Sequence, residues 1–370
     1  MTITHVVGAR PNFMKAAPVL SALGARGHRQ RLVHTGQHYD RNMSDVFFEQ
    51  LGLPEPDVNL GVGAGSHAVQ TGETMVRLEE HFEAERPDLV LVYGDVNSTV
   101  AASLVAAKLG VPIGHVEAGL RSRDRRMPEE VNRLITDQLA ALLFTPSVDG
   151  NENLVREGVD PEKIHLVGNV MIDTLVRLLP EAKGQWDRLS GAYGIERGAY
   201  VLVTLHRPST VDDEAVLRPV VAALGRLAER APVLFPVHPR TRARIAEVGL
   251  RVPPGVRLLD PVGYLDFLAL QDGARLVVTD SGGVQEETTY LGVPCLTVRE
   301  NTERPVTVTV GTNTLVGHDV DRMERLAVCV LNGAPVQGGR PILWDGAAGE
   351  RIADRIGEWA EARAPAAEVV

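Results

Sequence analysis

The chain has 370 residues, of which 44% are hydrophobic and 23% charged, and its formal net charge is −10 at pH 7. This length suggests two domains of common size, each able to bury its own core. The acidic balance argues against binding to nucleic acid or to an anionic membrane surface. No apolar run is long enough to span a bilayer.

The two cysteines, Cys295 and Cys329, both lie among apolar residues. We expect both to be buried and reduced, because their spacing suits neither a disulfide framework nor a zinc site. The chain begins with a strand pattern and lacks the basic segment and apolar run of a signal peptide. These features indicate a cytoplasmic protein.

Short apolar strand patterns recur along the chain, and a helical pattern follows each of them. In the first half, strands are expected at residues 3–8, 30–35, 88–94, 112–117, 142–146 and 164–168. In the second half, they are expected at residues 199–205, 232–237, 256–260, 275–280, 294–298 and 313–316. Alternation of strand and helix predicts parallel sheets flanked by helices.

Because this pattern runs twice, the predicted fold class is α/β, with two doubly wound Rossmann-like domains that face each other across a cleft. The expected boundaries are 1–168 for the N-terminal domain and 169–346 for the C-terminal domain. Residues 347–370 are expected to form a helix that packs back on the N-terminal domain and ends in a frayed tail. Ligands of such folds bind at the carboxyl ends of the strands, so residues just after strands are the candidates for function.

The first strand is followed by Gly8, Arg10 and Lys15 at the start of a helix. A dinucleotide fingerprint needs three spaced glycines here, so NAD binding is disfavoured. We expect Arg10 and Lys15 to hold a phosphate or to stabilise a leaving group, the alternative being an ordinary solvated helix start. Residues 61–66 contain three glycines but follow no strong strand, and we interpret them as a loop.

Carboxylates follow the next strands. Asp95 and Glu117 end neighbouring strands of the predicted sheet, where two carboxylates can share a site and have their pKa values pushed apart. The alternative is that either one caps a helix or pairs with a nearby arginine. Glu129 and Glu130 open the helix that carries Arg133, although acids in a first helical turn are also common for dipole reasons alone.

In the second half, His206 and His238 each follow a strand and each has an arginine close behind it. Two equivalent histidines at strand ends indicate proton carriers and phosphate partners rather than structural residues. No group of residues in the chain has convincing metal-ligand spacing, so no metal is expected.

Residues 277–287 combine a buried strand, Ser281 at a helix N-cap position and the glycines Gly282 and Gly283. A helix start of this kind suits a phosphate, although an ordinary strand-to-helix cap has the same pattern. Glu286 or Glu287, one turn later, is placed to reach a ribose hydroxyl. Upstream, Phe267 is a candidate for packing on a base, although core packing is an equal alternative.

Taken together, these motifs resemble the non-hydrolysing UDP-N-acetylglucosamine 2-epimerases, and the resemblance covers nearly the whole chain in order. The residues that carry it are Gly8 to Pro11 with Lys15, Gly94-Asp95, His115 to Arg121, Pro128 to Glu130 with Asn132-Arg133, His206-Arg207, Asp280 to Glu287, and Thr302 to Pro305. The resemblance implies a GT-B architecture and interconversion of UDP-GlcNAc and UDP-ManNAc for surface polysaccharide or glycoconjugate synthesis. It also implies no nicotinamide or other cofactor, no required metal, and a homodimer.

The resemblance assigns the diphosphate to Ser281, Gly282 and Gly283, the ribose to Glu287 and the uracil region to Phe267. It also implies a set of catalytic and substrate-binding residues: Arg10, Lys15, Asp95, Glu117, Glu129, Arg133 and His206. His238 and Arg304, which follow strands of the second half, are further candidates for substrate binding. The route implied is elimination of UDP while a carboxylate takes the C2 proton, followed by re-addition of UDP with protonation on the opposite face. Four alternatives remain open at this stage: hydrolysis to free ManNAc, a related 2,3-diacetamido sugar substrate, glycosyl transfer, and a nucleotide-sugar-binding regulator without catalysis.

Overall fold

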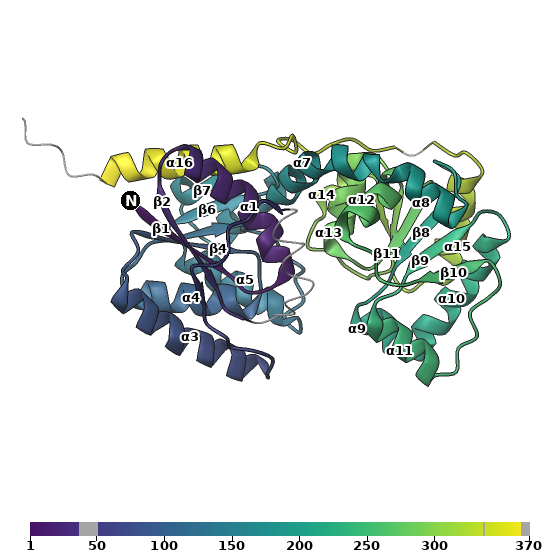
Figure 1. The fold of residues 1–370 in the computed structure, drawn as a ribbon, viewed down its shortest axis with the longest axis horizontal. Helices are drawn as coiled ribbons and strands as arrows, with labels where there is room; N and C mark the ends of the chain where they lie inside the picture. Colours follow the sequence, from purple (N-terminus) through teal and green to yellow (C-terminus); the bar gives the residue numbers. More distant parts are fainter. Residues whose placement is uncertain (37–50, 336, 364–370) are drawn as a thin grey trace, which may run out of the picture. The chain divides into compact units, whose positions relative to one another are not determined.

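The computed structural model describes residues 1–36, 51–335 and 337–363, without the side chain of Arg10. Contacts divide the chain into two compact units (Figure 1). The first comprises Met1–Thr174 with Ile342–Val370, and the second comprises Leu175–Pro341. Residues 169–174 and 342–346, which were expected in the second domain, therefore lie in the first unit.

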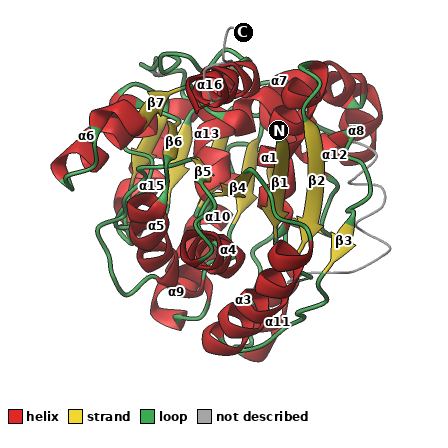
Figure 2. Ribbon diagram, turned by 90° about the vertical axis from the view of Figure 1, so that its left-hand side faces the viewer, coloured by secondary structure: helices red, strands yellow, loops and turns green. Residues whose placement is uncertain are grey.

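The first unit contains a seven-stranded sheet in the order β3-β2-β1-β4-β5-β6-β7, and all of its strand pairs are parallel. Its strands are β1 (Thr2–Val7), β2 (Arg29–His34), β3 (Val58–Asn59), β4 (Leu89–Tyr93), β5 (Ile113–Val116), β6 (Leu142–Thr145) and β7 (Ile164–Leu166). The order can be followed in Figure 2 from β7 to β3. The chain reverses its direction of winding between β1 and β4, which is where doubly wound folds bind ligands.

Helices cover both faces of this sheet (Figure 1). They are α1 (Arg10–Ala25), α3 (His67–Ala84), α4 (Asn97–Lys108), α5 (Pro128–Leu139), α6 (Val148–Arg156), the short 3₁₀ helix η1 (Pro161–Lys163), the first part of α7 (Val170–Gly184), and α16 (Ala348–Arg363). The C-terminal helix α16 packs against α1, so segments from the two halves of the sequence lie side by side in this unit. Of the predicted frayed tail, residues 363–370, the first residue still belongs to α16 and the others lie outside the described residues.

The second unit contains a six-stranded parallel sheet in the order β10-β9-β8-β11-β12-β13, with its own change of direction between β8 and β11. Its strands are β8 (Val201–Thr204), β9 (Val233–Pro236), β10 (Val256–Leu259), β11 (Leu276–Thr279), β12 (Cys295–Thr297) and β13 (Asn313–Leu315). Its helices, after the end of α7, are α8 (Trp186–Tyr193), α9 (Pro208–Val211), α10 (Glu214–Ala228), α11 (Pro239–Glu247), α12 (Tyr264–Gly273), α13 (Gly282–Leu291), α14 (Val306–Thr309) and α15 (Val320–Leu331).

Each unit has its own hydrophobic core of strand and helix residues. Strand β4 is buried along its whole length, as expected for a parallel strand with helices on both faces. The twelve strands expected from the sequence are all present, at the expected places. The additional strand β3 has only two residues, too few to form a recognisable apolar pattern in the sequence.

Two further results concern the surface. Cys295 is buried as predicted, but the prediction for Cys329 is wrong, because this cysteine is exposed on α15. An apolar run in the sequence does not decide which side of a helix faces solvent.

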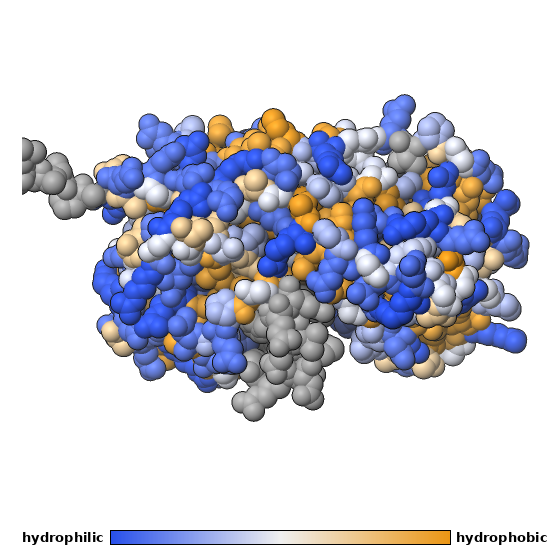
Figure 3. All heavy atoms as spheres, turned by 45° about the horizontal axis from the view of Figure 1, so that its top comes forward, coloured by the Kyte–Doolittle hydropathy of each residue, from blue (hydrophilic) through white to orange (hydrophobic). Residues whose placement is uncertain are grey.

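The face drawn in Figure 3 carries many hydrophilic residues with hydrophobic ones between them. Within the described residues, no helix combines the length and the apolar character needed to cross a membrane.

Candidate functional site

The chemistry-bearing residues of the first unit follow the carboxyl ends of β1, β4 and β5. In the sheet order, β1 lies beside β4 and β4 beside β5, so the loops after these strands emerge next to one another. Lys15 lies on α1 directly after β1, Asp95 follows β4, and Glu117 follows β5. The predicted grouping of these residues at one sheet edge is therefore what the fold produces.

Lys15 and Glu117 form an ion pair between the Lys15 Nζ and the Glu117 Oε2. Their side chains are only 7% and 3% exposed. The pair lies against Gly94, where a β-carbon would come within 2.6 Å of the Lys15 Nζ and 3.0 Å of the Glu117 Oε2. A side chain at position 94 would therefore require the Lys15–Glu117 pair to shift, and the positive φ of 63° also favours glycine there.

The backbone at Glu117 has a positive φ of 72°, which is uncommon for a residue with a side chain. The N–H groups of Glu117 and Ala118 both donate to the carbonyl oxygen of Phe144 on the neighbouring strand β6, at 3.1 and 3.0 Å. These bonds hold the turn that directs Glu117 toward Lys15. Strain of this kind is typical of functional sites.

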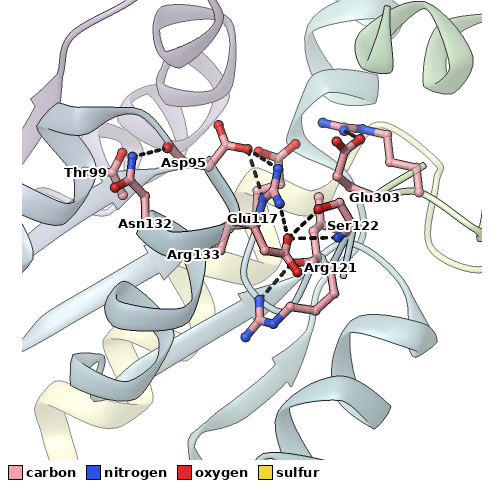
Figure 4. Close-up of polar contacts among 12 residues, drawn as sticks. Asp95, Thr99, Glu117, Arg121, Ser122, Asn132, Arg133 and Glu303 are labelled. Carbon is pink, nitrogen blue, oxygen red and sulfur yellow. Dashed lines mark hydrogen bonds and ion pairs between the residues drawn. The ribbon is translucent and has the colours of Figure 1, made fainter. Parts of the chain in front are cut away.

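Asp95 is bound by Arg133, whose Nε and Nη2 lie 3.0 and 2.8 Å from the Asp95 Oδ2 (Figure 4). Asn132 from the same helix, α5, donates to the Asp95 carbonyl oxygen at 2.9 Å. Helix α5 thus positions Asp95 through both its side chain and its backbone. Arg133 is 3% exposed, and its buried charge is compensated by the carboxylates of Asp95 and Glu130.

The adjacent acids Glu129 and Glu130, which the sequence could not tell apart, have different environments. Glu130 is buried and accepts hydrogen bonds from Ser122, from the backbone of Arg123 and from Arg133. Glu129 is half-buried, and its side chain makes no hydrogen bond or ion pair within the part of the chain that the structure describes. Glu130 therefore holds the loop, and Glu129 is the acid available to a ligand.

A buried histidine connects the ends of β4 and β5. His115 Nε2 lies 2.8 Å from the carbonyl oxygen of Gly94, and Nδ1 lies 2.6 Å from the Asp137 Oδ1. Burial acts to raise the pKa of Asp137, but His115 and Arg121 more than offset this and keep it below its ordinary value. The ring thereby links Asp137 on α5 to the end of β4. This role of His115 is not visible in the sequence pattern.

The role of Asn12 in holding the start of α1 was not predicted from the sequence either. Its Oδ1 accepts the backbone N–H groups of Gly8 and Ala9, at 3.1 and 3.0 Å, and its Nδ2 donates to the carbonyl oxygen of Tyr93 at 2.7 Å. The first turn of α1 is thereby tied to the end of β4. The predicted role of Arg10, where α1 begins, depends on a side chain outside the described residues.

In the second unit, His206 follows β8 and pairs with Asp280, the residue after β11. The His206 Nδ1 lies 3.0 Å from the Asp280 Oδ1. Asp280 is fully buried and also accepts the backbone N–H groups of His206 and Arg207. The two carboxylate oxygens of Asp280 therefore hold both the backbone and the ring of the candidate His206.

Ser281 occupies the N-cap position of α13, as predicted, although its side chain accepts no capping hydrogen bond. A β-carbon at Gly282 would come within 2.7 Å of the Arg304 Nη1. Arg304 is held by Glu286, with 2.9 Å between Nε and Oε1, and by Glu303. An arginine beside an uncapped helix N-terminus is suited to an anion such as a phosphate.

Glu287 is buried, and its partners lie on α12. Its Oε1 accepts from the Tyr264 hydroxyl at 3.0 Å, and its Oε2 accepts from the Gln271 amide at 2.6 Å. Burial raises the pKa of Glu287 to about 7. Phe267 lies half-buried on α12, the helix that also carries Tyr264 and Gln271.

The structure thus gathers the predicted residues into two groups, one in each unit. The first-unit group is Lys15, Asp95, Glu117, Glu129 and Arg133. The second-unit group is His206, His238, Phe267, Ser281, Gly282, Gly283, Glu287 and Arg304. The roles assigned to these residues remain predictions.

Comparison with known proteins supports the family that the sequence motifs indicate. Residues 21–357 match the family described as UDP-N-acetylglucosamine 2-epimerase. The chain is 41% identical over 359 residues to a UDP-N-acetylglucosamine 2-epimerase of Methanocaldococcus jannaschii, which covers 95% of this chain and 98% of that protein. It is 42% identical over 360 residues to a UDP-2,3-diacetamido-2,3-dideoxy-D-glucuronate 2-epimerase of Pseudomonas aeruginosa, covering 96% and 99% of the two chains.

Solved structures agree with these matches. A crystal structure of the Methanocaldococcus jannaschii UDP-GlcNAc 2-epimerase in complex with UDP-GlcNAc and UDP is similar to this chain, with a TM-score of 0.87 and 39% identity over 97% of this chain and 100% of that one. The Neisseria meningitidis UDP-GlcNAc 2-epimerase bound to UDP-GlcNAc gives a TM-score of 0.87 at 29% identity, with coverage of 97% and 100%. The predicted fold class, two doubly wound α/β domains of GT-B type, is confirmed.

Proposed function

The chain belongs to the UDP-N-acetylglucosamine 2-epimerase family, and from this premise we propose that it interconverts UDP-GlcNAc and UDP-ManNAc by inversion at C2 of the sugar. The observation that carries the proposal is the placement of Asp95 and Glu117 after the adjacent strands β4 and β5, with Lys15 paired to Glu117. Acids and a buried cation at one sheet edge match a reaction that moves a proton while a charged group departs.

The chemistry requires such a set of groups. The C2 hydrogen is not adjacent to a carbonyl, so its direct removal as a proton is slow. We propose elimination instead: the C1–oxygen bond to UDP breaks while a carboxylate takes the C2 proton, which gives 2-acetamidoglucal. UDP then adds back to C1 as a second acid delivers a proton to the opposite face of C2.

The available groups suggest a division of roles. Asp95, Glu117 and Glu129 form the acid/base set, because two faces of the sugar ring need more than one proton carrier. Lys15 and Arg10 in the first unit and His206 in the second stabilise the departing diphosphate. The N-terminus of α13 and Arg304 bind the diphosphate, and Glu287 binds the ribose.

Incubation with UDP-GlcNAc in deuterium oxide, followed by NMR at C2, tests the proposal. We expect UDP-ManNAc that carries deuterium at C2. UDP-ManNAc that keeps its original hydrogen would exclude the elimination route, and free ManNAc with UDP would assign the chain to hydrolysis instead.

A second substrate is favoured by one observation, the 42% identity to the UDP-2,3-diacetamido-2,3-dideoxy-D-glucuronate 2-epimerase of Pseudomonas aeruginosa. Comparison of kcat/KM for this nucleotide sugar and for UDP-GlcNAc distinguishes the two. We expect a higher kcat/KM for UDP-GlcNAc. A higher kcat/KM for the 2,3-diacetamido sugar nucleotide would make that compound the proposed substrate instead.

A further inference from the structure

Two histidines of the second unit, His206 and His238, have opposite hydrogen-bond partners at Nδ1. In His206, Nδ1 faces Asp280 at 3.0 Å. Burial acts to raise the pKa of Asp280, but His206 and the backbone N–H groups of His206 and Arg207 lower it below its ordinary value. An ionised carboxylate only accepts hydrogen bonds, so the His206 Nδ1 carries the hydrogen.

In His238, by contrast, Nδ1 accepts the backbone N–H of Arg240 at 3.2 Å as the N-cap of α11. This nitrogen therefore has a lone pair rather than a hydrogen, and the ring is the neutral Nε2–H tautomer. Partial burial, the neighbouring His206 and Arg240 together lower the pKa of His238. The two rings lie 6.1 Å apart, a distance at which two cationic rings would repel each other.

We propose that Asp280 is a positioning residue: it holds a hydrogen on Nδ1 of His206 and orients the ring so that Nε2 is the atom presented to the departing diphosphate. The inference rests on the proposed function and adds to it the residue that orients His206. The side chain of His206 is 40% exposed although Asp280 is fully buried, so the ring is accessible to a ligand.

The charged and titratable groups around His206 are Asp280 after β11, His238 at the start of α11, and its chain neighbour Arg207, with Arg240 beside His238. Of these, only Asp280 is an anion. Burial lowers the pKa of Arg207 but does not give it a basic role, because arginine stays protonated in proteins. The orientation of the His206 ring therefore depends on a single carboxylate.

The first test reads the wild-type protein directly and uses substitutions only to assign its resonances. The nitrogen resonances of histidine-¹⁵N-labelled protein, assigned with His206→Asn and His238→Asn, report which ring nitrogen carries hydrogen. We expect protonated Nδ1 in His206 and unprotonated Nδ1 in His238 near pH 7. An unprotonated Nδ1 in His206 would overturn the inference, whether or not UDP-GlcNAc is the substrate.

The second test is kinetic. Asp280→Asn is expected to lower kcat by about 100-fold or more while the KM for UDP-GlcNAc changes by less than about 3-fold, because orientation and charge are lost rather than substrate contacts. The matched control is Asp260→Asn, which removes a 93%-exposed carboxylate just after β10 and should leave kcat unchanged.

A double substitution separates positioning from a general structural effect. In a His206→Asn background, Asp280→Asn should lower kcat no further, because Asp280 acts through His206. An additional loss as large as that in the wild-type background would contradict the positioning role. If the wild-type protein failed to epimerise UDP-GlcNAc, the proposed function would fall, while the NMR result would still decide the protonation of His206.

Discussion

The Lys15–Glu117 ion pair lies directly against the α-carbon of Gly94. Gly94 ends β4, its φ is 63°, and its carbonyl oxygen is held by His115 at 2.8 Å. The next residue is Asp95, so the glycine that the Lys15–Glu117 pair touches is bonded directly to a second candidate acid. Space at Gly94 therefore controls the relative positions of Glu117 and Asp95.

Gly94→Ala should abolish most of the activity. Its β-carbon would come within 2.6 Å of the Lys15 Nζ and displace the ion pair, and we expect kcat to fall by about 100-fold or more. Gly110→Ala is the control, because Gly110 also has a positive φ, 66°, but its β-carbon would meet nothing nearer than 3.9 Å. Both variants should lose about 1–2 kcal/mol of stability from backbone strain. Equal kcat values in steady-state assays would show that the ion pair is not needed.

Glu129→Gln and Glu130→Gln should have opposite effects. Glu130 accepts bonds from Ser122, Arg123 and Arg133, so its loss should cost about 3–5 kcal/mol of unfolding free energy. Glu129→Gln should change stability by less than about 0.5 kcal/mol but lower kcat by about 10²- to 10⁴-fold. Denaturant unfolding and turnover measured on both variants provide the check. A fully active Glu129→Gln variant would remove Glu129 from the acid/base set.

Glu287 should make the stability depend on pH. Its pKa is raised by burial from 4.5 to about 7, so the folded state binds the proton more tightly than the unfolded state does. The stabilisation is therefore complete below pH 4.5 and is lost as the pH rises through about 7. The unfolding free energy of the wild type, relative to Glu287→Gln, should fall by roughly 3 kcal/mol over this range. A difference that stays constant with pH would show that Glu287 is not perturbed in the folded state.

Two glycines of α16 offer a test of its packing on α1. A β-carbon at Gly349 would come within 2.8 Å of the Pro18 carbonyl oxygen, so Gly349→Ala should cost about 1–3 kcal/mol. In the same helix, a β-carbon at Gly357 would meet nothing within 4 Å, and Gly357→Ala should stabilise the protein by about 0.5–1 kcal/mol. Thermal unfolding of both variants measures the contrast, and two similar melting temperatures would mean that α16 does not depend on close contact with α1.

The sequence predicted much of the fold, because strands, helices and their alternation leave a local signature. Every strand of four or more residues was recognisable from its apolar run, and Ser281 was recognisable as a helix N-cap. Placement after strands was enough to select Asp95, Glu117 and His206 as candidates, since parallel strands of one sheet end at one edge.

Only the tertiary structure distinguished residues that have the same local pattern. Glu129 and Glu130 are neighbours in one helical turn, yet one is available to a ligand and the other holds a loop. Asp280 lies 74 residues from its partner His206, and Glu117 lies 102 residues from Lys15. Local periodicity specifies which elements form, because it reflects burial of one face, whereas partner choice depends on distances between elements that are set only when the sheets assemble.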